Sequence, residues 1–255
     1  MTFTVEQFEF FLMIMVRISA FIYTAPFFSI GSVPQRVKIG LSAVLSYLAF
    51  TLLPYEPLSY AGSLGFLIMA VMNAIAGFAM GFFANINTHI LSFTGQIVDM
   101  QIGFSMATEY DPATRTTVSL TSNILNYAVI LILLVTRLHY YIIEAVMDSF
   151  HVIPIAEAAL RPEIYKLMLQ FVIDFCVIGF RIALPVFAAT LIANTVLAIL
   201  AKVAPQMNMF VIGIQMKVLI GLAVLAVVTL RLDAISDAIF DEMYKMLRAV
   251  IPYLH

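Results

Sequence analysis

Long apolar runs constrain this 255-residue chain more than any other feature of its sequence. The long runs lie at residues 10–30, 64–84, 167–200 and 209–230, and shorter ones lie at residues 39–53 and 118–135. A bilayer core about 30 Å thick needs roughly 20 helical residues, because each backbone polar group must find its hydrogen-bond partner within the segment. The pattern predicts an all-α protein of the membrane type with about six apolar helices.

Composition supports the same class. Hydrophobic residues make up 63% of the chain and charged residues only 11%, whereas soluble domains carry about 25% charged residues. A soluble globular domain is therefore excluded. The formal net charge of -2 provides no basic field for a nucleic acid. Cys176 is the only cysteine, so an internal disulfide and a cysteine-clustered metal site are excluded as well.

A proline interrupts the longest apolar run. Residues 167–200 would form a helix about 50 Å long, which exceeds one bilayer crossing. Pro185 lies near the midpoint, and proline lacks the N–H that an interior helix position needs. We predict either a bent helix or a tight helical hairpin at Pro185.

Polar side chains recur every three or four residues between the second and third long runs. They are Asn85, His89, Ser92, Gln96 and Asp99. The opposite side of the same segment, residues 85–104, is apolar, which predicts one two-faced helix. Its polar stripe faces either the membrane surface or a water-filled path or partner subunit.

Four charged residues fall inside apolar runs: Arg17, Asp174, Arg181 and Lys217. At the bilayer centre each would cost about 3 kcal/mol or more. We expect them to pair with one another or with partner chains.

Small residues indicate close helix packing. Gly77 and Gly81 stand four residues apart, a spacing that lets two helix backbones approach. This face contacts either another subunit or another helix of the same chain. A second amphipathic segment, at about residues 231–251, predicts a C-terminal helix that packs on its own bundle, lies on the membrane or docks a partner.

The polar interval at residues 95–117 predicts a loop. Asp111 and Pro112 end any helix there, and residues 103–108 are mostly small. Long loops within compact membrane domains act as gates more often than as plain connectors. We therefore predict a gate.

Catalysis has little support. The four histidines have no metal-ligand spacing, and the sequence contains no P-loop, dinucleotide-binding or nucleophile-elbow motif. We expect no enzyme activity, no cofactor and no metal site.

Four blocks carry a family resemblance. Residues 200–213 read Leu-Ala-Lys-Val-Ala-Pro-Gln-Met-Asn-Met-Phe-Val-Ile-Gly, which resembles the signature of the FliR family of flagellar biosynthetic proteins and its injectisome counterparts. The other blocks are residues 25–36, 95–112 and 150–155. The resemblance covers the whole chain in order, although Lys217 departs from the pattern of many relatives.

The resemblance implies one FliR-type domain over residues 1–255, built of extended helical hairpins that pack in a helical hetero-oligomeric export gate. Members are non-enzymatic subunits of the type III export gate in the bacterial inner membrane, within the flagellar basal body. They assemble with P-type and Q-type subunits (FliP, FliQ), contact the B-type subunit (FlhB) and pass unfolded exported proteins.

The resemblance also implies a plug-like loop at about residues 103–117 that closes the channel. Its plug residues would be Gly103, Phe104, Ser105, Met106, Ala107, Thr108, Glu109, Tyr110, Asp111 and Pro112. Pro205 and Gly213 of the signature join Gly77 and Gly81 as expected helix-packing residues. Two alternatives stay open: a small-molecule secondary transporter, in which the polar stripe and the Pro185 break would mark a site at the membrane midplane, and an injectisome subunit.

Overall fold

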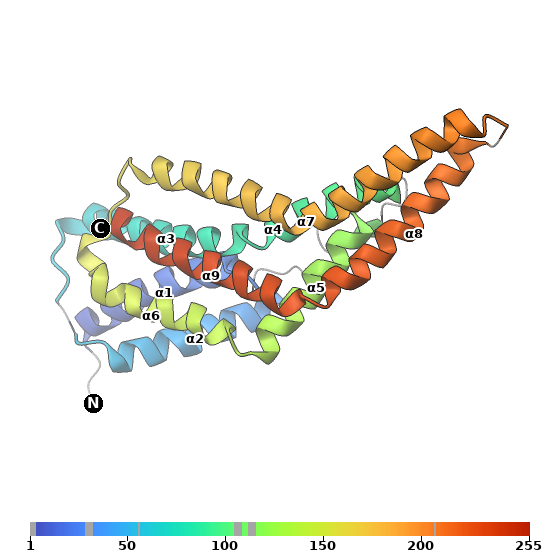
Figure 1. Cartoon of the computed structure of the whole chain (residues 1–255). Coiled ribbons are helices and arrows are strands. Elements are labelled where there is room, and N and C mark those ends of the chain that lie inside the picture. Colours follow the sequence, from blue (N-terminus) through green and yellow to red (C-terminus); the bar gives the residue numbers. More distant parts are fainter. Residues whose placement is uncertain (1–3, 29–32, 56, 105–108, 112–115, 207) are drawn as a thin grey trace. The chain divides into compact units, whose positions relative to one another are not determined.

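The computed structural model describes residues 4–28, 33–55, 57–104, 109–111, 116–206 and 208–255, and the chain divides into two compact units (Figure 1). The first unit comprises Met1–Asn87, Arg137–Val172 and Phe240–His255. The second comprises Thr88–Thr136 and Ile173–Ile239. Each unit is therefore built from segments that are far apart in the sequence.

Helices dominate the described residues, as the sequence predicted. In the first unit they are α1 (Val5–Thr24), α2 (Gln35–Leu52), α3 (Gly62–Ile86), α6 (His139–Val152) and the short 3-10 helices η2 (Ile155–Glu157) and η3 (Ile251–Tyr253). In the second they are α4 (His89–Ile102), α5 (Leu120–Val135) and α8 (Met209–Thr229). Helices α7 (Ile164–Val203) and α9 (Leu232–Val250) contribute to both units.

Helices α1 and α3 form the core of the first unit. Helix α1 begins with a capping box, in which the side chains of Thr4 and Gln7 accept each other's backbone N–H. Its buried face includes Met13 and Ile14, and it lies directly on the glycines of α3. A Cβ on Gly77 would lie 2.0 Å from the Arg17 carbonyl oxygen. The glycine pair thus serves a helix contact within this unit.

Helix α4 lies at the centre of the second unit. It shares an apolar core with α7, formed by Val98 and Ile102 against Ala183 and Val186. Glycines bring the neighbouring helices close: a Cβ on Gly221 of α8 would lie 2.4 Å from the Ile102 side chain. Helix α4 is therefore held by α5, α7 and α8 together.

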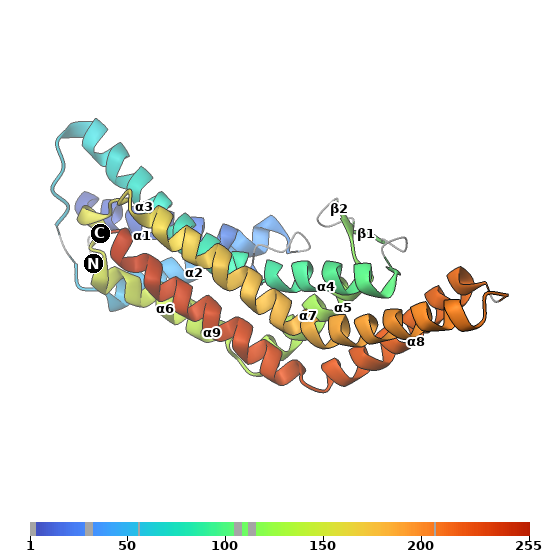
Figure 2. The ribbon, with the colours of Figure 1, turned by 45° about the horizontal axis from the view of Figure 1, so that its top comes forward.

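Helix α7 passes through Pro185 without interruption, so the predicted hairpin at Pro185 is wrong. One missing N–H removes one hydrogen bond from a 40-residue helix, and the remaining bonds keep it continuous. Helix α7 ends instead at Val203, and α8, which begins at Met209, returns beside it (Figure 2). The Asn208 side chain accepts the Val211 N–H and caps α8.

Within the described residues, three stretches are long and apolar enough to cross a membrane: Gly62–Ile102, Ile164–Val203 and Val211–Thr229. A fourth results if α5 and α6 together form one broken span. The prediction of about six apolar helices therefore gives only a loose estimate of how many stretches could cross a membrane. The runs at residues 10–30 and 39–53 do contain helices, α1 and α2, but neither passes this test.

The segment 85–104 is not one helix, which corrects the sequence prediction. Helix α3 ends at Ile86 and α4 begins at His89, so Asn85 belongs to the first unit and the rest of the stripe to the second. The side-chain amide of Asn87 donates to the Phe83 carbonyl. Such local side-chain bonds compete with the backbone ladder at helix ends.

The predicted loop contains a short β-hairpin. Strands β1 (Glu109–Asp111) and β2 (Thr116–Val118) pair antiparallel, with Tyr110 opposite Thr117. Of the predicted plug residues, Ser105, Met106, Ala107, Thr108 and Pro112 lie outside the described residues.

Helix α9 covers the predicted C-terminal segment, and its second half packs on its own bundle. Ile239, Met243 and Leu247 are fully buried. The last residues are hydrogen-bonded to the segment that follows η2, because the Ala159 N–H donates to the Leu254 carbonyl at 3.1 Å.

Candidate functional site

The polar stripe of α4 faces α5 in the second unit. The Ser122 hydroxyl donates to the Ser92 carbonyl at 2.8 Å, and the Asn126 amide donates to the Ser92 hydroxyl at 3.0 Å. Asp99 accepts a hydrogen bond from the Thr121 hydroxyl and another from the Thr121 N–H at 3.4 Å. We call this set, Ser92 and Asp99 with Thr121, Ser122 and Asn126, the polar seam.

A glycine allows the polar seam to close. A Cβ on Gly95 would lie 2.3 Å from the Ser122 backbone nitrogen and 2.4 Å from its Cα. Any side chain at this position would separate α4 from α5. The contact therefore requires glycine, and it brings hydroxyl and amide groups of α5 within reach of the stripe.

The polar seam ends where the predicted plug loop begins. Gly103 follows α4 with φ +95°, a left-handed conformation that glycine adopts readily, and its N–H donates to the Asp99 carbonyl at 3.0 Å. Ser119 caps α5, and its hydroxyl accepts the Ser122 N–H at 3.1 Å. Both ends of the hairpin segment therefore leave from capped helices that are bonded to each other.

Only part of the predicted stripe belongs to this seam. Asp99 is buried and Ser92 is half-buried, but His89 and Gln96 are exposed on α4. Sequence reasoning missed the α5 partners. Spacing could have indicated only part of the set: Ser119, Ser122 and Asn126 recur at three and four residues near the start of the apolar run at residues 118–135, but Thr121 lies outside this spacing.

A second polar network lies in the first unit around Arg17, which is completely buried. Its guanidinium donates twice to the Asn73 side-chain oxygen, at 3.0 and 2.7 Å, and once to the Ile153 carbonyl at 2.9 Å. It also stacks over the Phe150 ring, 4.5 Å from the centroid. The Asn73 amide donates onward to the Ile155 carbonyl at 2.9 Å. These partners are neutral, so the expected pairing of Arg17 with another charge is wrong.

The other charges inside apolar runs lie in different surroundings. Arg181 is exposed on α7 and Lys217 is half-buried on α8. Asp174 has an interaction partner of its own.

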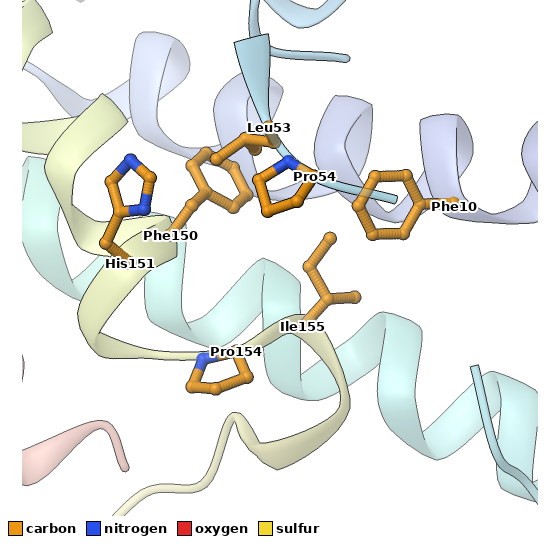
Figure 3. Close-up of a pocket in the computed structure, with 7 residues that line it drawn as sticks. All are labelled: Phe10, Leu53, Pro54, Phe150, His151, Pro154 and Ile155. Carbon is orange, nitrogen blue, oxygen red and sulfur yellow. The ribbon is translucent and has the colours of Figure 1, made fainter. Parts of the chain in front are cut away.

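A small cavity lies beside the Arg17 network (Figure 3). Its volume is about 110 Å³, and it is lined by Phe10, Leu53, Pro54, Phe150, His151, Pro154 and Ile155. This volume is well below the roughly 300–1,000 Å³ of small-molecule sites.

A groove of about 410 Å³ lies between α7 and α8, and every residue that lines it is apolar, among them Ala193, Val196 and Met216. It offers no polar side chain to orient a polar substrate. In the described ranges, no group of three or more His, Cys, Asp or Glu side chains could hold a metal ion.

Comparison with known proteins identifies the family. Residues 8–243 match the model of the family described as bacterial export proteins, family 1. The chain belongs to this family. The flagellar biosynthetic protein FliR of Escherichia coli (strain K12) is 28% identical over 242 residues, which cover 94% of this chain and 92% of the relative.

Other FliR proteins match over similar lengths. That of Bacillus subtilis (strain 168) is 26% identical over 97% of this chain and 96% of its own length. That of Buchnera aphidicola subsp. Schizaphis graminum is 31% identical over 83% of this chain and 81% of its own length. The resemblance noted in the four sequence blocks is thereby confirmed.

Proposed function

We propose that this chain is a non-enzymatic subunit of the flagellar type III protein export gate. The observation that carries the proposal is the family match over residues 8–243, together with FliR relatives that align along nearly their whole length. The chain forms part of the protein-conducting channel in the bacterial inner membrane of the flagellar basal body. It assembles there with FliP, FliQ and FlhB.

The apolar surface of the second unit supports an assembled state. Only 11% of the most apolar window in Val211–Thr229 is buried. Large apolar side chains of α7 and α8 are exposed, including Leu184, Phe187, Leu191, Ile192, Val196, Ile199, Leu219, Leu222 and Val227. Contiguous surfaces of this kind need lipid or partner subunits. Neighbouring subunits of the gate would supply such a cover.

The loop at residues 103–117 serves in this proposal as the channel plug. Its two ends leave from helices α4 and α5, which are bonded to each other at the polar seam and give the loop a fixed base. Unfolded proteins must pass without loss of ions, so the channel needs a seal that yields to the chain in transit. Energy for transport comes from other components, because the sequence contains no nucleotide-binding motif.

The transporter alternative loses one of its two structural supports. It rested on the polar stripe and on a broken helix at Pro185, and α7 is continuous there. The cavity beside the Arg17 network is too small for most small-molecule substrates, and the groove between α7 and α8 has no polar lining. The injectisome alternative is less well supported than the flagellar one, since the compared relatives are named as flagellar proteins.

Deletion of residues 104–108 tests the plug. Cells that carry the deletion should assemble the gate, as judged by co-purification of FliP with this chain, and should leak ions through it. Leak is measured as the loss of membrane potential in cells that express the gate. Unchanged leak with an intact assembly would remove the plug from the proposal.

A further inference from the structure

We propose that Asp99 and Thr121 form a clasp that fixes the two ends of the plug loop against each other and thereby sets how tightly the gate seals. This inference rests on the proposed function, since it assigns positioning residues to the same gate. Neither residue needs to line the channel. Both act through the segment between α4 and α5.

The position of the pair carries the argument. Asp99 lies one turn before Gly103, where α4 ends, and its carbonyl accepts the Gly103 N–H. Thr121 lies in the first turn of α5, two residues after the capping Ser119. The bonds between Asp99 and Thr121 therefore join the last turn before the loop to the first turn after it.

The chemistry makes this bond the strongest of the seam. A carboxylate that accepts from a hydroxyl forms a charge-assisted hydrogen bond, roughly twice as strong as a neutral one. Asp99 is only 2% exposed, as is Thr121. If Thr121 loses its hydroxyl, the carboxylate stays buried with a poorer partner, which is costly. The helix ends then separate to admit water.

The bonds farther along the seam provide a contrast. Ser92 bonds Ser122 and Asn126 through neutral groups, and it lies nearly two turns further from the loop than Asp99. Loss of the Ser92 hydroxyl weakens the α4–α5 contact without freeing the loop ends. A loop whose ends are fixed samples fewer conformations than one whose ends separate, so loss of the clasp should affect the seal more than loss of the Ser92 bonds.

The test uses the full-length chain in cells that assemble the export gate. Thr121→Val keeps the shape of the side chain and removes the hydroxyl, and Thr121→Ser keeps the hydroxyl. Ser92→Ala is the matched control within the seam. We expect a several-fold higher ion leak for Thr121→Val at equal gate assembly, and near wild-type leak for both Thr121→Ser and Ser92→Ala.

A second single variant, Asp99→Asn, covers the case in which Thr121→Val assembles poorly. Asp99→Asn keeps the volume and one acceptor oxygen, so it should leak at an intermediate level. In the double variant Asp99→Asn/Thr121→Val, leak should not exceed that of Thr121→Val alone, since both changes remove one interaction. Additive leak would contradict a shared clasp.

The ion leak of each variant is compared with that of the deletion of residues 104–108. If the deletion leaks but Thr121→Val in an intact gate does not, the clasp is wrong and the plug stands. Equal leak from Ser92→Ala and Thr121→Val also overturns the clasp, because general loosening of the seam would then explain both. If neither the deletion nor Thr121→Val leaks, the proposed plug function itself fails.

Discussion

Arg17 is the largest side chain that the described part of the chain buries completely. Its guanidinium is satisfied by the Asn73 amide oxygen and the Ile153 carbonyl rather than by a carboxylate. The planar fork of arginine suits this arrangement, because it directs several donors at fixed angles. The network fixes the segment 153–155, part of the family-like block 150–155, onto α1 and α3. Its role is structural.

We predict that Arg17→Met destabilises the first unit by about 2–4 kcal/mol, since the Ile153 carbonyl and the Asn73 oxygen lose their donors while buried. Arg17→Lys should recover only part of the lost stability, because an ammonium group cannot direct donors at the fixed angles of the planar guanidinium. The measurement is the thermal unfolding midpoint of the purified complex in detergent, followed by circular dichroism. A midpoint for Arg17→Met equal to wild type would contradict the role assigned to the network.

Tyr60, which lies between α2 and α3, makes a pH-dependent contact with α1. Its hydroxyl donates to the Glu9 carboxylate at 2.7 Å, and this hydrogen bond, with smaller contributions from desolvation and nearby charge, raises the pKa of Tyr60 above its ordinary value. A raised pKa means that the contact stabilises the fold below the unfolded-state pKa of about 10. The contribution is lost as pH rises through the folded-state pKa.

Tyr60→Phe should therefore lower the unfolding midpoint slightly at neutral pH and flatten its fall between about pH 9 and pH 11. Tyr47→Phe, at an exposed position on α2, is the control and should keep the wild-type profile. The same fall with pH in Tyr60→Phe as in the wild-type protein would assign the alkaline transition to other groups.

At the scale of elements, sequence periodicity predicted the helices well and their interruptions poorly. Apolar runs identified α3, α7 and α8, because a helix in an apolar environment must be apolar over its length. Of the two alternatives predicted at Pro185, the hairpin is wrong, since one absent hydrogen bond bends a long helix more readily than it ends it. The break at residues 87–88 carries no proline or glycine and depends on side-chain bonding by Asn87, which periodicity does not register.

Helix α2 shows why burial could not be predicted from polarity alone. It buries Lys38, Ser42 and Ser46, while Val44 and Tyr47 are exposed. The two serine hydroxyls donate to carbonyls one turn earlier, at 2.7 and 2.6 Å, so their burial leaves no unsatisfied donor. Small polar residues on the inner face permit close packing. The apolar outer face suits lipid or another subunit.

Two helical glycines with different surroundings predict opposite effects for the same substitution. Gly77→Ala places a methyl group 2.0 Å from the Arg17 carbonyl oxygen, and overpacking of this kind costs about 1–3 kcal/mol or more. Gly40→Ala in α2 meets nothing within 4 Å and should stabilise by up to about 1 kcal/mol through helix propensity. Unfolding midpoints of the two variants should shift in opposite directions. A stabilising Gly77→Ala would contradict the α1–α3 contact.

At the scale of the whole molecule, the sequence predicted the class and the family but not the internal organisation of the site. The stripe from Ser92 to Asp99 was visible as a periodic pattern, whereas its partners on α5 depend on the fold that brings residues 92–99 beside residues 119–126. The neutral network of Arg17 likewise joins positions more than 50 residues apart. Such pairs follow from tertiary packing and not from spacing.

The large exposed apolar surface of α7 and α8 makes assembly the central claim. The most direct test is native mass spectrometry of the tagged chain, purified in mild detergent after expression with and without its FliP-type and FliQ-type subunits. We predict a hetero-oligomer that contains one copy of this chain, and poor recovery of the chain without those subunits. A stable species of this chain alone, unchanged when the other subunits are present, would contradict the proposed assembly.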